Sequence, residues 1–421
     1  MMKKVKYRAT NVNKLDWAKV GEQVRGREVL LSVDVAKADF VGLLSTSDDE
    51  VKQLIKWTHP HETGDLLNAL TGLDVARLEA AMEPTGTYGD ALRWQLNKRG
   101  ITVHRVNPKH VHDQAESFDG VPSSHDAKAA CIIDDLHSRD RSQVWQETPT
   151  EQRELRGMVE ELEIHQNLHR ANLNRLSALM VRHWPELEYV MPLGSVSVLT
   201  LLSAYGDPAQ VAWNEDEAND LLRRAGRAGL KAEKRQAILA SAQDSLGVPC
   251  VTNERQHIQS LAADLLRTHQ ASAEVEARMA AAVEERDELS SLAEVCGKTT
   301  SIVLIALLGD LRRYPSAKSL LNAMGLNLKE QSSGQHKGIL RITKRGPGKV
   351  RFYLYWLVLR LIHRDAHIKA WYERKLARDG NRGKGRALIA IMRKLVKGLW
   401  HVAQGARFDS RKLFNLEATP A

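Results

Sequence analysis

Three acidic residues in the first third of the chain have the pattern of a metal-binding site. Asp34 lies inside an apolar run, residues 29–35, where an ionised side chain is costly unless it is paired or metal-bound. Glu83 ends another apolar run, and Asp126 opens a segment expected to be helical. Mg²⁺ needs several carboxylates held close together, and it supports phosphodiester cleavage. Each acid taken singly could instead be structural, Asp126 as a helix cap.

A second reactive pattern lies near the C-terminus. Ser332, Ser333 and Gly334 precede a basic stretch, residues 338–346, that is interrupted by glycines. A serine becomes a useful nucleophile when its proton is removed and the developing charge is stabilised. Clustered Lys and Arg perform the second task for a phosphate target. The local sequence alone favours the alternative, a Ser-Gly turn beside ordinary DNA-binding cations.

Positive charge is concentrated in this C-terminal region. The chain has 421 residues and a formal net charge of +9. From Lys329 to Trp400 there are 19 Lys and Arg against four acids, an excess of 15, so the rest of the chain is net acidic. A single sign over so long a segment favours phosphate binding over a merely solvated helix face. The candidate nucleic-acid contacts are Lys109, Lys337, Arg341, Lys344, Arg345, Lys349, Arg351, Arg393 and Lys394.

Composition narrows the class of protein further. The apolar fraction of 43% is that of a soluble globular protein. No run of about 18 apolar residues is present, so we expect no membrane span. The basic N-terminus is not followed by an apolar signal core. Cys131, Cys250 and Cys296 are far apart, form no zinc pattern and are expected to be reduced thiols. A cytoplasmic protein is therefore predicted.

The first part of the chain is predicted to be an α/β domain. Residues 1–25 have the composition of a loosely structured arm. Apolar runs then predict strands at residues 29–35, 38–44, 78–83 and 101–106, and amphipathic segments predict helices at 66–73, 88–99 and 125–138. Strands that alternate with helices indicate a layered α/β architecture around one mixed sheet.

Helices dominate the remainder. Residues 151–184 and 254–295 each carry one apolar stripe, as long pairing helices do. We expect dimerisation through these helices, and an internal hairpin is the alternative. The predicted organisation is an arm (1–25), an α/β domain (26–147), long coiled-coil helices with a helical insertion (148–292), a mainly α domain (293–410) and a tail (411–421).

One internal repeat is present. Residues 194–207 and 297–310 align without a gap, and each contains a small turn, a helix and a Gly-Asp pair. The glycine lets the backbone approach a phosphate, and a helix N-terminus favours an anion. This is similar to a helix-hairpin-helix element that grips the DNA backbone. The alternative is a repeated core helix without a ligand.

The chain resembles the DEDD insertion-sequence transposases of the one-hundred-ten / eleven-eleven group. The resemblance extends from Glu28 to Phe408. The N-terminal hallmarks are Asp34-Val35-Ala36-Lys37, the Glu-x-Thr-Gly-x-Tyr motif at 83–88, and Val106-Asn107-Pro108-Lys109. The C-terminal hallmarks are Gly325-Leu326, Ser332-Ser333-Gly334, the Ile-Thr-Lys-x-Gly motif at 342–346, Val350-Arg351 and Arg393-Lys394-Leu395.

This resemblance implies a specific chemistry. The N-terminal domain would be RuvC-like, with a ribonuclease H fold, and Asp34, Glu83, Asp126 and one more acid would bind Mg²⁺ or Mn²⁺. In the C-terminal serine transposase domain, Ser332 or Ser333 would attack a DNA phosphate and form a phosphoserine link. Such proteins work as oligomers, here a dimer or tetramer, and use a noncoding bridge RNA to pair with donor and target DNA. A bacterial, nucleoid-associated location is implied.

One position departs from the family pattern. The third motif should read Asp-x-x-Asp-Ala, but residues 126–130 place Ala129 where the fourth acid is expected. We interpret Ala129 as an engineered inactivating substitution. The alternative is a natural variant in which Asp134 or Asp135 replaces the missing acid. Two other functions stay open: a junction resolvase or nuclease without a covalent intermediate, and a nucleic-acid-binding protein without activity.

Overall fold

The computed structural model describes residues 7–84, 86–121, 123, 125–226, 229–330, 340–380 and 383–415. The chain divides into two compact units, residues 1–147 and 148–421, and each is described by itself. The cysteines are free thiols, buried at Cys131 and Cys296 and half-buried at Cys250.

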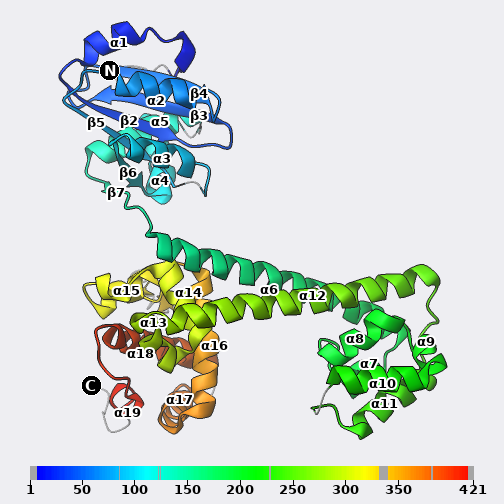
Figure 1. Cartoon of the computed structure of the whole chain (residues 1–421). Helices are drawn as coiled ribbons and strands as arrows, with labels where there is room; N and C mark the ends of the chain where they lie inside the picture. The colour runs from blue at the N-terminus through cyan, green and yellow to red at the C-terminus, as the bar shows by residue number, and fades with distance from the viewer. Residues whose placement is uncertain are drawn as a thin grey trace. The chain divides into compact units, whose positions relative to one another are not determined.

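The first unit is built on a mixed seven-stranded sheet with the strand order β1-β4-β3-β2-β5-β6-β7 (Figure 1). The strands are β1 (Thr10–Asn11), β2 (Glu28–Asp34), β3 (Asp39–Thr46), β4 (Lys52–Thr58), β5 (Arg77–Met82), β6 (Thr102–Val106) and β7 (Ser142–Val144). The central strands β2, β5 and β6 are parallel, whereas β3, β4 and β7 each run antiparallel to a neighbour. The predicted mixed α/β sheet is therefore confirmed.

Helices cover both faces of this sheet. The helices of the unit are α1 (Trp17–Val24), α2 (Thr63–Thr71), α3 (Asp90–Lys98), α4 (Pro108–Asp119) and α5 (Asp126–Ser138), with the 3-10 helix η1 (Val12–Lys14). On one face, α1, α2 and α3 bury their apolar residues against Leu31, Val33 and Phe40. On the other face, α5 packs its residues Ala130 and Ile133 against the strands. Because side chains along a strand point alternately to the two faces of the sheet, every second side chain faces α5.

The prediction of a loosely structured arm is wrong for the described part of residues 1–25. Strand β1 pairs in parallel with β4, with Thr10 opposite Ile55. Val20 and Val24 of α1 are buried in the core of the sheet. Helix α1 is short and has only two buried valines, so the helical periodicity of its apolar residues is too brief to be recognised in the sequence. Its stability comes from packing on the sheet.

The second unit is almost entirely helical in its described residues. Its helices are α6 (Thr150–His183), α7 (Leu187–Val190), α8 (Val196–Tyr205), α9 (Pro208–Trp213), α10 (Glu215–Gly226), α11 (Ala232–Gln243), α12 (Thr252–Glu284), α13 (Asp287–Cys296), α14 (Lys298–Leu308), η3 (Leu311–Arg313), α15 (Ala317–Ala323), α16 (Gly348–Arg364), α17 (Ala366–Arg378), α18 (Lys384–Ala403) and α19 (Ser410–Leu413). A small antiparallel pair, β8 (Leu328–Lys329) and β9 (Arg341–Ile342), completes it.

The two long helices α6 and α12 pack against each other within the chain. Arg278 of α12 forms an ion pair with Glu161 of α6 at 2.6 Å, and His169 contacts Thr268 at 3.3 Å. Leu155 and Met279 belong to one apolar core with α13 to α18. A second core joins the other ends of both helices to α8, α10 and α11. An internal helix pair is therefore present, and dimerisation through these helices stays a prediction.

The internal repeat corresponds to two buried helices, α8 and α14. Each helix ends at a glycine with positive φ, 78° at Gly206 and 75° at Gly309. The following aspartates, Asp207 and Asp310, accept hydrogen bonds from backbone amides of the next helical turn. The Gly-Asp pair thus ends one helix and begins another, which is the role expected of a C-terminal glycine followed by an N-cap.

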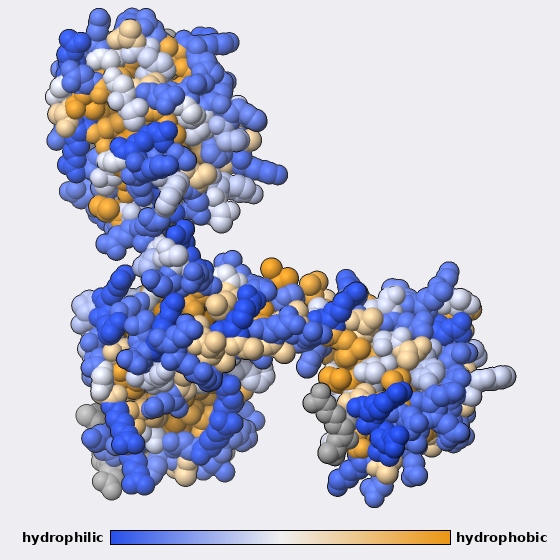
Figure 2. All heavy atoms as spheres, in the orientation of Figure 1, coloured by the Kyte–Doolittle hydropathy of each residue, from blue (hydrophilic) through white to orange (hydrophobic). Residues whose placement is uncertain are grey.

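None of the described helices is both long and apolar enough to cross a membrane. Hydrophilic residues cover much of the visible face of each part, between smaller hydrophobic areas (Figure 2).

Candidate metal centre and nucleic-acid interface

Asp34 and Glu83 stand at the ends of two neighbouring parallel strands. The register of β2 and β5 pairs Val33 with Met82, so the next residues along the two strands are Asp34 and Glu83. Ser32 is on the sheet face that meets α5, and Asp34, two residues later, has the same orientation. Asp126 is the first residue of α5. The fold therefore brings the three predicted carboxylates to one edge of the sheet.

The pKa of Asp34 responds to the charges of the other two carboxylates. The pKa of Asp34 is raised to about 6, first by burial and then by the negative charges of Asp126 and Glu83, while a hydrogen bond from the Val35 amide opposes the shift. Crowded, partly buried carboxylates repel one another unless a cation lies between them. Hard oxygen donors in such a group suit Mg²⁺ or Mn²⁺. The residues present therefore fit a divalent cation.

The start of α5 is capped by His125, not by Asp126. The Nδ1 atom of His125 accepts a hydrogen bond from the Lys128 amide at 3.2 Å. Asp126 lies in the first turn, where the helix dipole favours a negative charge. Its carboxylate is therefore not used as the cap, one of the two roles that the sequence left open.

Lys128 anchors this end of α5, a role that the sequence analysis missed. Its side chain is 1% exposed, and its ammonium group donates to Asp119 at 2.7 Å and to the carbonyl oxygens of Val121 and Ser123 at 2.6 and 3.0 Å. The hydrogen bonds from Lys128 and Tyr7 lower the pKa of Asp119 to about 2. These contacts fix the α4–α5 connection.

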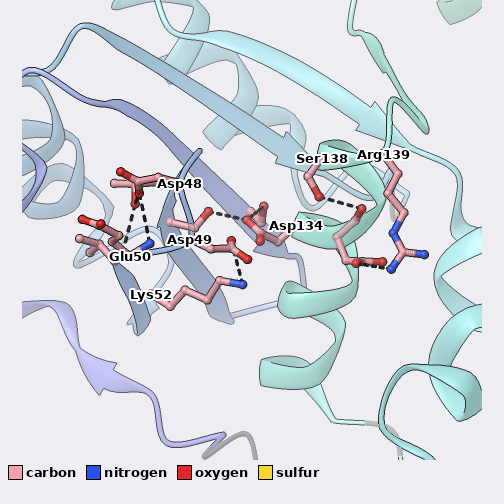
Figure 3. A network of polar contacts seen from close by, with 12 residues as sticks. Asp48, Asp49, Glu50, Lys52, Asp134, Ser138 and Arg139 are labelled. Atoms are coloured by element: carbon pink, nitrogen blue, oxygen red, sulfur yellow. Dashed lines mark hydrogen bonds and ion pairs between the residues drawn. The ribbon is translucent and has the colours of Figure 1, made fainter. Parts of the chain in front are cut away.

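Ala129 lies on α5 one turn after Asp126. It is half-buried and packs against the apolar cluster that contains Ala81, two residues before Glu83. Asp134 is 6% exposed and accepts hydrogen bonds from Ser32 at 3.2 Å and Ser45 at 2.5 Å (Figure 3).

Asp135 also has partners of its own. It accepts hydrogen bonds from Gln114 and Arg139, at 2.5 and 2.7 Å. Neither Asp134 nor Asp135 is among the carboxylates that raise the pKa of Asp34. Both acids proposed as substitutes are therefore engaged elsewhere on α5.

The predicted nucleophiles Ser332 and Ser333, and the predicted cation Lys337, lie outside the described residues. The segments on either side of them pair: Leu328 is opposite Ile342, and Lys329 is opposite Arg341.

A basic pocket of about 660 Å³ adjoins this strand pair. Its described lining contains six cations and no acid; the cations are Lys329, Arg341, Lys344, Lys375, Arg386 and Arg393. Three of these, Arg341, Lys344 and Arg393, were predicted to bind nucleic acid. The others were missed because they are contributed by β8, α17 and α18, and only the tertiary structure gathers them. A pocket with this charge fits phosphate groups.

Of the other predicted cations that the structure describes, Arg345 is exposed, and the remaining four have protein partners. Lys109 pairs with Asp113 and Lys349 with Glu163. Arg351 donates to the carbonyl oxygens of Met324 and Gly346, both at 3.0 Å. Lys394 lies over the rings of Trp371 and Phe414, at 5.6 and 5.8 Å from their centroids. Arg351 and Lys394 therefore support the fold at their positions.

Two family models and one curated protein match this chain. Residues 31–185 match the DEDD domain model of IS110 elements, described as a transposase, and residues 289–373 match the model described as the transposase IS116/IS110/IS902 family. The chain is 26% identical over 256 residues to the insertion element IS110 uncharacterized 43.6 kDa protein of Streptomyces coelicolor, a match that covers 56% of this chain and 60% of that protein.

The sheet with its acids at the strand ends is thus a ribonuclease H-like DEDD domain, followed in the same chain by a helical transposase domain. The first match contains Asp34, Glu83, Asp126 and all of α6, and the second runs from α13 into α17. The chain belongs to the IS110 family of insertion-element transposases.

Proposed function

We propose that this protein is the transposase of a bacterial insertion element and cleaves and joins DNA strands. The observation that carries the proposal is the convergence of Asp34, Glu83 and Asp126 at one sheet edge, where the last two raise the pKa of the first. The family membership supports the same activity. The six-cation pocket of the second unit supports DNA as the substrate.

The carboxylates would hold Mg²⁺ or Mn²⁺ through their oxygen atoms. When bound, such a cation stabilises the charge that develops on a reacting phosphate. Asp34 and Glu83 are fixed by adjacent strands, and Asp126 is fixed by the Lys128 anchor of α5. These supports hold the three oxygen donors in place without a large loss of conformational entropy on binding.

Ser332 or Ser333 is proposed as the nucleophile. Its Oγ would form a bond to the DNA phosphorus, the phosphorus–oxygen bond to one strand would break, and that strand would leave as a hydroxyl end. The serine proton would pass to a neighbouring base. The resulting phosphoserine link preserves the energy of the broken phosphodiester bond. The hydroxyl end of a second strand can therefore attack the phosphorus of this link and be joined. The motif and the adjacent cations Arg341 and Lys344 support this step.

Guidance by a bridge RNA and assembly as a dimer or tetramer are also proposed. The resemblance of the motifs and the excess of 15 positive charges between Lys329 and Trp400 support a second nucleic-acid partner. The long helices α6 and α12 are the surfaces proposed for assembly.

Ala129 is proposed to impair cleavage. Its position on α5, one turn after Asp126, would place a carboxylate beside the other three acids. The substitution Ala129→Asp is therefore expected to increase Mg²⁺-dependent cleavage, by about 10²-fold or more if a missing charge-stabilising donor is restored.

The test is a denaturing gel of labelled donor DNA incubated with the Ala129→Asp protein, Mg²⁺ and the cognate RNA. We expect a slow, protease-sensitive DNA band that is lost in either Ser332→Ala or Ser333→Ala, which names the nucleophile. The matched control is Asp135→Asn in the same background, which should keep the band because Asp135 is bound by Gln114 and Arg139. Free cleaved ends without the band would indicate a hydrolytic nuclease. No cleavage at all would favour a binding protein without activity, the second candidate that Ala129 itself supports.

A further inference from the structure

A cluster of two histidines and one glutamate lies on the α5 face of the sheet. Glu79 is on β5, His104 is on β6 and His137 is in the last turn of α5. One ligand atom of each lies within 4.8 Å of those of the other two. Nothing in the proposed DNA chemistry uses these residues.

The contacts within this cluster are close and directed. Glu79 Oε1 lies 3.0 Å from His104 Nε2. The rings of His104 and His137 meet edge to face with centroids 4.5 Å apart. His137 Nδ1 is 2.7 Å from the hydroxyl of Ser142, so Nε2 is the nitrogen left to face the cluster. The side chains of Glu79 and His104 are 15% and 13% exposed, which leaves a path for an ion and a water molecule.

We propose that Glu79, His104 and His137 bind a divalent transition-metal ion, most suitably Zn²⁺, at a site separate from the carboxylate centre. Two imidazoles and one carboxylate form a recognised ligand set for Zn²⁺, with water in the fourth position. In a tetrahedral site with bonds of about 2.0–2.1 Å, two ligand atoms lie about 3.3 Å apart, close to the Glu79–His104 distance. The ligand atoms of all three residues lie within 4.8 Å of one another, so binding requires a small adjustment of the side chains.

The charge states of the cluster suit a metal ion. Burial, then the neighbouring His104, lowers the pKa of His137, which favours the neutral imidazole that binds metals. The pKa of Glu79 is also lowered: burial opposes the shift, but the hydrogen bond and charge of His104 and the charge of Arg77 outweigh it. Ser142 orients the His137 ring, as a second partner of a metal-bound histidine commonly does.

This site and the carboxylate centre lie at opposite ends of α5. Glu79 and Glu83 are four residues apart on one strand line, about 13 Å. Asp126 and His137 are eleven residues apart on α5, about 16 Å. The separation is too large for one ion to serve both groups. A metal at the second site would tie β5, β6 and the C-terminal end of α5 together, and so stabilise the sheet unit.

The experiment uses the full chain, freed of metal with a chelator and of any affinity tag, and titrated with Co²⁺ and Zn²⁺. We expect one equivalent of Co²⁺ to give intense visible absorption typical of four-coordinate cobalt, and stoichiometric Zn²⁺ to displace it. Zn²⁺ at about a hundredfold excess over its Kd should raise the Tm by roughly 5 °C or more. Excess Mg²⁺ should leave the cobalt spectrum unchanged.

Variants assign the signal to these residues. His104→Gln, Glu79→Gln and His137→Gln should each weaken Co²⁺ binding at least tenfold, whereas His112→Gln, with a side chain 91% exposed on α4, should not. Asp34→Asn should retain the cobalt spectrum, which separates this site from the carboxylate centre. The Tm of each metal-free variant shows whether it folds. Absence of stoichiometric binding to the unmodified chain, or binding that survives in a folded His104→Gln protein, would overturn the proposal.

Discussion

At the scale of single residues, Asp34 carries the clearest electrostatic signature. Its carboxyl group is held beside two other acids, and burial together with their charges raises its pKa to about 6. An acid with a raised folded-state pKa destabilises the folded protein when it is ionised. This penalty is fully present above about pH 6 and disappears as the pH falls toward 3.8, the ordinary pKa of an aspartate.

Replacement of Asp34 therefore has a predictable effect on stability. At pH 8, Asp34→Asn should increase the free energy of unfolding of the metal-free protein by roughly 1–2 kcal/mol, which raises its Tm by a few degrees. This gain should shrink as the pH is lowered toward 4. Mg²⁺ should stabilise the unmodified chain at pH 8 but not the variant. Thermal unfolding at several pH values measures this. Glu28→Gln, an exposed acid at the start of the same strand, is the control. Equal Tm values at pH 8 would show that the carboxylates do not interact.

At the scale of elements, the position of α5 depends on a buried ion pair at its first turn. Lys128 is nearly inaccessible and joins Asp119 at the end of α4. A buried cation that loses its partner, or a carboxylate and two carbonyl groups that lose their donor, destabilises a fold strongly.

Lys128→Met should thus lower the Tm by several degrees and weaken Mg²⁺ binding, because α5 carries Asp126. The sign of the pH dependence follows from Asp119, whose pKa is lowered from 3.8 to about 2. Its contribution is complete above pH 3.8 and is lost as the pH falls through 2, so the Tm difference between the two proteins should narrow over that range. Lys109→Met is the control, since its pair with Asp113 is exposed. A constant difference down to pH 2 would contradict the assignment.

The two Gly-Asp turns of the repeat provide a matched pair at the same scale. Both glycines have positive φ, but Gly206 (ψ −28°) lies in the left-handed region, where an alanine costs about 1–2 kcal/mol, whereas Gly309 (ψ −167°) lies in a region that essentially only glycine adopts. A Cβ at Gly206 would lie 2.7–2.8 Å from Arg255, including its backbone oxygen, whereas at Gly309 the nearest atom is the end of Gln152 at 3.3 Å.

Gly206→Ala, through its contact with Arg255, and Gly309→Ala, through its backbone conformation, should therefore each lower the free energy of unfolding by about 1–3 kcal/mol. Chemical denaturation followed by circular dichroism measures both. If the glycines instead serve phosphate contact, both variants would lose DNA affinity with little loss of stability. That result would favour the helix-hairpin-helix interpretation over the buried core helix.

At the scale of the whole molecule, the uneven charge predicts how binding responds to salt. The six-cation pocket gathers residues from β8, β9, α17, α18 and the segment after β9. Each phosphate contact that is lost reduces the slope of log affinity against log salt by about 1.

Arg341→Ala and Arg386→Ala should each weaken DNA binding and reduce this slope by about 1, uniformly across DNA sequences. Lys394→Ala should leave the slope unchanged and lower the Tm, because its ammonium group lies over Trp371 and Phe414. Fluorescence anisotropy at several salt concentrations measures the slope. An unchanged slope in both arginine variants would exclude this pocket as the DNA contact.

The sequence by itself determined the layered α/β domain, the long helices and the three carboxylates. These features are local: an apolar run, an apolar stripe, or an acid placed where a buried strand ends. Strand β4 escaped prediction because the exposed Lys52 and Lys56 interrupt its apolar residues, although they share the α5 face of the sheet with the buried Leu54. Helix α1 escaped because its eight residues are stabilised mainly by the sheet beneath them.

Only the tertiary structure decided which distant side chains meet. Glu79, His104 and His137 belong to three different elements, so no sequence motif predicts that they meet. Lys128 is an ordinary helix residue in the sequence, and its burial depends on the path of the α4–α5 connection. Arg386 and Lys375 join Arg341 in one pocket because α17, α18 and β9 pack together. Periodicity along a chain specifies elements, whereas contacts between elements depend on packing that no local pattern encodes.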